Sequence, residues 1–275
     1  MQPGPIGIFD SGYGGLTILS QIREQMPEYD FLYLGDNART PYGTRSFEVV
    51  YEFTSQAVKA LFDMGCSLVI LACNTASAKA LRTIQQIDLP KIDPRKRVLG
   101  IIRPTVEYLG DITHSRHVGI LATSGTIKSQ SYPLEIKKLF PDITVSGEAC
   151  PIWVPLVESG EAQSEGTDYF VRRHIDNLLA KDDKIDTLIL GCTHYPLLSE
   201  VIGDFMGPEV QLVSPGAETA EYLIKKLKQA DALASPERQG SHRYYVTDSA
   251  EIFRRQASLF MDSDISGEVS QTELL

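Results

Sequence analysis

The chain lacks the features expected of membrane, secreted and nucleic-acid-binding proteins. No part of its 275 residues approaches the roughly 18 consecutive apolar residues of a membrane-spanning helix. The segment Met1–Pro5 has neither the basic region nor the apolar core of a secretory leader. Asp and Glu outnumber Lys and Arg by 36 to 26, and the resulting net charge of −10 argues against nucleic-acid binding. We therefore expect a cytoplasmic protein with no nucleic-acid or membrane partner.

Cysteine is also scarce, with four residues in the whole chain. In a reducing compartment, so few cysteines are expected to remain free thiols. Two of them, Cys73 and Cys192, each follow an apolar run, 68–72 and 187–191, and each precedes polar residues. Such a run is typical of a buried parallel strand that opens into a loop. Open α/β sheets bind their ligands at these strand ends.

Strand and helix patterns alternate along the chain, which predicts an α/β fold. The first strand is expected at residues 6–9, before the glycine-rich turn at 10–15. Further strands are expected at 31–35, 68–72, 98–102, 118–121, 143–145, 187–191, 211–213 and 244–246. Helices are expected at 47–64, 128–140 and 168–181, and a helix through Ile252 and Phe260 is expected to end the fold.

The similarity between the two cysteine segments also predicts the domain organisation. We expect two similar doubly wound domains, whose central, mostly parallel sheets face a shared cleft. Residues 1–97 plus 214–275 form the first predicted domain, which carries Asp10 and Cys73. Residues 98–213 form the second, which carries Cys192 and His194.

The two strand-end thiols are the main candidates for chemistry. A cysteine is a useful proton-transfer group because a helix amino terminus or a nearby cation can lower its pKa from about 8.5. Cys73 and Cys192 both lie where a strand passes into a helix, so backbone N–H groups can act on each of them. A free cysteine is more often a small buried hydrophobe, and we interpret Cys66 and Cys150 in that way.

Neighbouring polar residues extend this candidate site. Asp10 and Ser11 end the first strand, where Asp10 either accepts or orients a proton near Cys73 or caps the following helix. The turn lacks the spacing of a phosphate loop or a dinucleotide fingerprint. His194, two residues after Cys192, can favour a thiolate or protonate a departing base. On sequence alone, Glu158 is interpreted as a solvated helix residue.

Metal binding is the alternative use of the same residues. Zinc accepts thiolate and imidazole ligands, which Cys73, Cys192 and His194 would supply. Neither cysteine belongs to a C-x₂-C pair, and Cys-x-His is not a usual structural spacing. The sequence therefore predicts no metal site.

Five motifs, in order along the chain, resemble the glutamate racemase family. They are Asp10-Ser11-Gly12-x-Gly14-Gly15, Pro41-Tyr42-Gly43, Cys73-Asn74-Thr75-Ala76, Ala122-Thr123-Ser124-Gly125-Thr126 and Gly191-Cys192-Thr193-His194-Tyr195-Pro196. The similarity extends from Ile6 to about Phe260. The wider aspartate/glutamate racemase superfamily shares the paired cysteines. The segments that are similar to the glutamate branch are Asp10-Ser11-Gly12, Pro41-Tyr42-Gly43 and Cys192-Thr193-His194-Tyr195-Pro196.

The resemblance implies cofactor-independent racemisation of glutamate, with the D form supplied to peptidoglycan synthesis. It implies that Cys73 removes the proton of D-glutamate and Cys192 that of L-glutamate, while the opposite thiol returns a proton. Asp10 would support Cys73, and His194 and Glu158 would support Cys192. The implied substrate-binding residues are Ser11, Pro41, Tyr42, Gly43, Asn74, Thr75, Thr123, Thr126 and Thr193. Dimers are common in the family, so a homodimer is expected.

The chain departs from the common family pattern at Arg103, where a smaller or acidic residue often stands, and the segment after Met261 has no assigned counterpart. Two alternatives stay open on the sequence. One is a racemase for aspartate or another amino acid, and the other is an amino-acid-binding regulator without turnover. Racemisation needs only a proton removed from one face of an α-carbon and another delivered to the opposite face. The paired thiols meet that need, so glutamate racemisation is the prediction.

Overall fold

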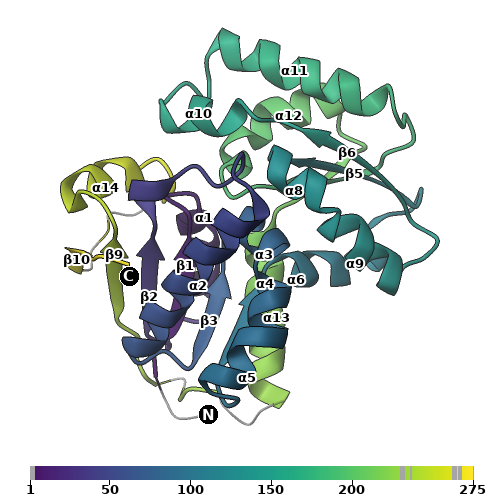
Figure 1. Ribbon diagram of the computed structural model, residues 1–275. Helices are drawn as coiled ribbons and strands as arrows, with labels where there is room; N and C mark the ends of the chain where they lie inside the picture. The colour runs from purple at the N-terminus through teal and green to yellow at the C-terminus, as the bar shows by residue number, and fades with distance from the viewer. Residues whose placement is uncertain (1–3, 230–232, 236, 262–264, 266–267, 275) are drawn as a thin grey trace.

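The computed structural model describes residues 4–229, 233–235, 237–261, 265 and 268–274, and it contains two β-sheets surrounded by helices (Figure 1). The strands of the six-stranded sheet, in spatial order, are β10 (Glu268–Gln271), β9 (His242–Val246), β2 (Phe31–Gly35), β1 (Ile6–Asp10), β3 (Leu68–Leu71) and β4 (Arg97–Gly100). Those of the four-stranded sheet are β6 (Thr144–Ala149), β5 (His117–Ala122), β7 (Thr187–Gly191) and β8 (Gln211–Val213). Every described strand pair is parallel, so the predicted α/β class is confirmed.

Helices pack on both faces of the six-stranded sheet, because alternate residues of its strands point to opposite sides. Ile8 of β1 packs in one apolar cluster with α1 (Gly15–Gln25), α13 (Pro215–Gln229) and α14 (Ala250–Ala257). Phe9, the next residue, packs in a second cluster with α2 (Phe47–Asp63). Both faces of β1 are therefore buried, which explains its continuous apolar sequence.

The four-stranded sheet is covered in the same way. Ile120 of β5 packs in an apolar cluster with α6 (Ile102–Glu107), α7 (Leu109–Ile112) and α9 (Ser131–Leu139). Leu121 belongs to the cluster that contains residues of α10 (Trp153–Glu158) and α11 (Glu165–Leu179). The remaining short elements are η1 (Asn37–Arg39), α3 (Asn74–Lys79), α4 (Leu81–Thr83), the π-helical η2 (Ile84–Asp88), α5 (Leu89–Ile92), α8 (Ser124–Ser129), η3 (Tyr195–Leu198) and α12 (Ser199–Met206). No helix in the described ranges is long and apolar enough to cross a membrane.

Three details differ from the sequence expectations. The predicted helix at 128–140 is two helices, α8 and α9, because Gln130 has a φ of 57° and ends α8 in the left-handed conformation. The helix through Ile252 does not end the fold, since β10 follows it and pairs with β9. The strand predicted at 98–102, at the start of the second domain, is β4 at Arg97–Gly100, and it pairs with β3 in the six-stranded sheet. The domain division as a whole, 1–97 plus 214–275 and 98–213, stays a prediction.

Candidate active site

A cavity of about 160 Å³ lies where loops from the two sheets meet. The loops that follow β1, β2 and β3 form one wall, and those that follow β5, β6 and β7 form the other. Because all these strands are parallel within their sheets, their carboxyl ends supply the lining. The lining residues are Ser11, Thr40, Pro41, Tyr42, Gly43, Thr44, Cys73, Asn74, Thr75, Thr123, Ser124, Pro151, Val154, Pro155, Cys192, Thr193 and His194.

Cys73 lies on the first wall, directly before α3. Its side chain is 6% exposed, its thiol donates to Ser11 Oγ at 3.5 Å, and its sulfur accepts the N–H of Ala76 at 3.4 Å. Burial, reinforced by the negative charge of Asp10, raises the pKa of Cys73 from 9 to about 12. In this state Cys73 is a neutral thiol that can donate a proton.

Asp10 lies behind the first wall rather than in the cavity lining. It is fully buried at the end of β1, and Oδ2 accepts the N–H of Gly12 at 2.9 Å, while Oδ1 has no hydrogen-bond partner. Burial raises the pKa of Asp10, and the charge of His194 opposes that rise. A Cβ on Gly15 would come within 2.5 Å of the Asp10 Cβ, so the glycine allows α1 to begin this close to the carboxylate.

Cys192 lies on the second wall, at the head of a hydrogen-bonded chain. Its sulfur is 3.9 Å from His194 Nδ1, and His194 Nε2 is 2.9 Å from Glu158 Oε1. Burial would lower the pKa of His194, but the hydrogen bonds to Cys192 and Glu158 outweigh it and raise the pKa from 6.5 to about 10. The imidazole is thus held as a cation, with its positive charge beside the Cys192 sulfur. Glu158 is partly buried and paired with His194, whereas its sequence context predicted a solvated helix residue.

Neutral hydrogen-bonding groups occupy much of the remaining lining. Three hydroxyls form a triangle: Thr75 lies 3.0 Å from Thr123 and 3.4 Å from Thr126, and Thr123 lies 3.1 Å from Thr126 (Oγ1 to Oγ1). Thr126 itself stands behind the lining. No Lys or Arg of the described chain lines this cavity, so His194 is its cationic group. A small ligand carrying carboxylates would be held mainly by hydroxyls and amides.

The Pro41-Tyr42-Gly43 segment is fixed to both parts of the molecule. The Tyr42 hydroxyl donates to the buried Asp36 carboxylate, which also accepts from Arg39 Nε at 2.7 Å. The carbonyl of Gly43 accepts the N–H of Gly125, from the second wall, at 2.8 Å. This hydrogen bond joins the two walls at the cavity rim.

Sequence reasoning missed some of the lining. Thr40 and Thr44 flank the Pro41-Tyr42-Gly43 motif, and Ser124 lies inside the motif that begins at Ala122, so their positions in the sequence were an available signal. The remaining lining residues reach the cavity because the loop after β6 and the helix α10 fold over it; they are Pro151, Val154 and Pro155. Nothing in the local sequence predicts that these residues line a site. All four cysteines are free, and the described residues include no group of three or more His, Cys, Asp or Glu that could hold a metal ion.

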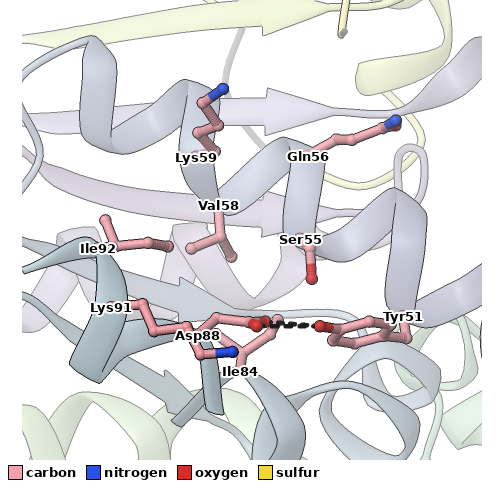
Figure 2. Close-up of a pocket in the computed structure, with 9 residues that line it drawn as sticks. All are labelled: Tyr51, Ser55, Gln56, Val58, Lys59, Ile84, Asp88, Lys91 and Ile92. Carbon is pink, nitrogen blue, oxygen red and sulfur yellow. Dashed lines mark hydrogen bonds between the residues drawn. The ribbon is translucent and has the colours of Figure 1, made fainter.

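A second cavity, of about 290 Å³, lies outside this site, between α2 and the η2–α5 segment (Figure 2). Here the Tyr51 hydroxyl donates to the carboxylate of Asp88, at 2.9 and 3.0 Å from its two oxygens. The lining of this second cavity contains no cysteine or histidine. Of the two cavities, only the smaller one contains the paired thiols.

Comparison with known proteins gives concordant results. The profile of the Asp/Glu/hydantoin racemase family matches residues 16–223. A glutamate racemase of Geobacter metallireducens is 40% identical over 270 residues, which are 98% of this chain and 96% of that protein. The crystal structure of a glutamate racemase from Bacillus anthracis has a TM-score of 0.92 at 33% identity, covering 100% of this chain and 99% of the other. That of the Francisella tularensis glutamate racemase in complex with D-glutamate has a TM-score of 0.89 at 32% identity, with the same coverage of 100% and 99%.

Proposed function

The chain belongs to the glutamate racemase family, within the Asp/Glu/hydantoin racemases, and is an isomerase, and we propose that Cys73 and Cys192 carry its proton transfers. One observation carries this proposal: the two thiols line one small cavity but come from opposite walls. Glutamate bound between them would present one face of its α-carbon to each sulfur.

In the L-to-D direction, the Cys192 thiolate takes the α-proton of L-glutamate and becomes a thiol. The Cys73 thiol then delivers its own proton to the opposite face of the α-carbon and becomes a thiolate. The D-to-L direction uses the same two groups in reverse. No bond other than C–H and S–H forms or breaks, so the reaction needs no oxidant and no group donor.

The protonation states of the free site support the L-to-D direction. The raised pKa of Cys73 keeps it a proton donor, and the His194 cation lies 3.9 Å from Cys192 Sγ, the sulfur that we propose as the base. After one turnover Cys192 is the thiol and Cys73 is the thiolate, and proton exchange with water has to restore the starting protonation states. Asp10 opposes the thiolate at Cys73, so it drives that sulfur back to the thiol.

The difficult step is removal of a proton beside a carboxylate, because negative charge develops at the α-carbon. Preorganised donors stabilise such charge best where water is excluded. Asn74, Thr75 and Thr193 follow the two cysteines directly, and each is at most 3% exposed. We assign to them, and to the other lining hydroxyls and amides, the binding of the substrate carboxylates and ammonium.

The test is the racemisation of L-glutamate followed by circular dichroism, without pyridoxal phosphate. Cys73→Ala and Cys192→Ala are each expected to lose at least about 100-fold in rate, as expected for loss of an acid or base. Cys66→Ala is the matched control, since Cys66 is also buried but lies outside the cavity, and the variant should stay active. Unchanged racemisation by either Cys73→Ala or Cys192→Ala refutes the two-thiol mechanism, and faster turnover of aspartate than glutamate refutes the substrate assignment.

The cellular setting follows from the family resemblance. We propose that the enzyme supplies D-glutamate to peptidoglycan synthesis in the cytoplasm and acts as a homodimer. Sedimentation with and without glutamate tests the dimer, and a monomeric profile in both conditions contradicts it. Loss of cell-wall synthesis on depletion of the enzyme, restored by added D-glutamate, tests the cellular role.

A further inference from the structure

Tyr132 is a buried residue behind the cavity that the proton-transfer scheme does not use. It lies in the first turn of α9, on the side of the four-stranded sheet, and is 1% exposed. Its hydroxyl donates to Asn74 Oδ1 at 2.7 Å. Asn74 belongs to the opposite wall and directly follows Cys73, so this hydrogen bond joins the two walls beside one of the reacting thiols.

Only one of the two polar atoms of the Asn74 side-chain amide has a hydrogen-bond partner. Its side chain lines the cavity and is 2% exposed, but Nδ2 has no hydrogen-bond partner. A buried amide N–H group without a partner costs about 1–3 kcal/mol. An anion bound in the cavity would remove that cost, because it can accept both Nδ2 protons.

We propose that Tyr132 is a positioning residue for racemisation: by holding the Asn74 carbonyl outside the cavity, it presents Asn74 Nδ2 to the carboxylate on the reacting α-carbon. The inference rests on the proposed function, because it requires glutamate to bind beside Cys73. An amide turned by half a rotation would present an oxygen to the anion and repel it. The Tyr132 hydroxyl thus acts on the substrate only through Asn74.

Two features suit Tyr132 to this role. Burial raises its pKa far above the ordinary value of 10, so the hydroxyl keeps its proton across the pH range of an assay. The neighbouring Ser131 Oγ independently donates to the Ala78 carbonyl at 2.9 Å, which ties the start of α9 to α3 without Tyr132. Removing the Tyr132 oxygen should therefore free the Asn74 amide and leave the contact between the helices intact.

A double-mutant cycle tests whether Tyr132 acts through Asn74. Tyr132→Phe is expected to raise KM for glutamate about tenfold with little change in kcat, since a carboxylate contact is present in both ground and transition states. In an Asn74→Ala background, Tyr132→Phe should have no further effect. Multiplying effects in the double variant, or an unchanged KM in Tyr132→Phe, overturns the inference.

Asn74→Asp tests which atom faces the substrate, and it also serves if Tyr132→Phe does not fold. The aspartate can still accept from the Tyr132 hydroxyl, but it presents a charged oxygen where Nδ2 stood. We expect a higher KM than in Asn74→Ala. A KM equal to or below that of the wild type would mean that an oxygen faces the substrate, which overturns the inference.

Tyr51→Phe is the matched control, because it also removes one tyrosine hydroxyl bond between helical segments, in the second cavity (Figure 2). It should leave KM for glutamate unchanged, and a rise equal to that of Tyr132→Phe counts against a specific role for Tyr132. Cys73→Ala, assayed in parallel, reports on the proposed function separately. If it stays active, the two-thiol mechanism fails whatever the Tyr132 variants show.

Discussion

Replacing Glu158 by Gln should move the alkaline limit of racemisation to lower pH. Glu158 Oε1 lies 2.9 Å from His194 Nε2, and the two side chains are 25% and 6% exposed. Gln keeps the size and a hydrogen-bonding oxygen but removes the negative charge. The cationic form of His194 therefore loses the negative charge of one of the two partners that hold its pKa at about 10.

The size of the shift follows from the geometry. Breaking a buried ion pair costs about 3–5 kcal/mol, and we take about 2 kcal/mol because Glu158 is partly solvated and Gln keeps a hydrogen bond. At about 1.4 kcal/mol for each pKa unit, the pKa of His194 should fall by about 1.5 units, to roughly 8.5. His194 is charged below its pKa, and it is the cationic group of a cavity that has to hold the anionic glutamate. Activity should therefore decline as pH rises through about 10 in the wild type and through roughly 8.5 in the variant.

The assay is kcat/KM for L-glutamate as a function of pH, followed by circular dichroism. Glu148→Gln is the matched control, since Glu148 Oε1 lies 2.9 Å from His174 Nδ1 in a similarly buried pair outside the cavity. Its alkaline limit should equal that of the wild type. The reasoning is wrong if Glu158→Gln also keeps the wild-type limit, or if both variants shift equally.

Two further predictions concern the cavity walls. A Cβ at Gly14 would lie 2.2 Å from Thr193 Oγ1 and 2.5 Å from His194 Nδ1. Gly14→Ala should therefore displace the wall that carries Cys192 and lower kcat/KM by at least about tenfold. A fully active Gly14→Ala variant would contradict this prediction. Burial raises the pKa of Cys73 from 9 to about 12, so between these pH values the folded chain keeps a proton that the unfolded chain loses. The free energy of unfolding therefore falls as pH rises, by about 1.4 kcal/mol at pH 10. Cys73→Ser should remove that loss, measured by urea unfolding at about pH 8 and 10, and an equal pH dependence in both proteins would refute it.

The strands that carry the thiols were predictable because both of their faces are buried. β3 and β7 are continuous apolar runs, and the sequence placed both of them. The edge strand β10 was not predicted, because Glu268–Gln271 has only one buried apolar residue, Val269, and it forms a strand by pairing with β9. Local sequence carries little information about a strand that neighbouring backbone stabilises.

The site divides in a similar way. The motifs identified the thiols, the Asp10 turn and most of the lining, because those residues follow strand ends whose position the apolar runs reveal. The pairing of Glu158 with His194 was not visible in the residues, since the two are 36 positions apart and meet only through the placement of α10. The Tyr132 contact with Asn74 joins residues 58 positions apart, on helices that belong to opposite walls.

The sequence by itself therefore determined which chemical groups this protein has and which local elements carry them. Residues adjacent in the chain stay adjacent in space, so a thiol that follows a strand is found at the strand end in any α/β arrangement. Only the tertiary structure decided the protonation states: burial makes Cys73 a thiol, and Cys192 and Glu158 make His194 a cation. Solvent exclusion and charge separation depend on groups brought together from distant parts of the chain, and those distances exist only in the folded protein.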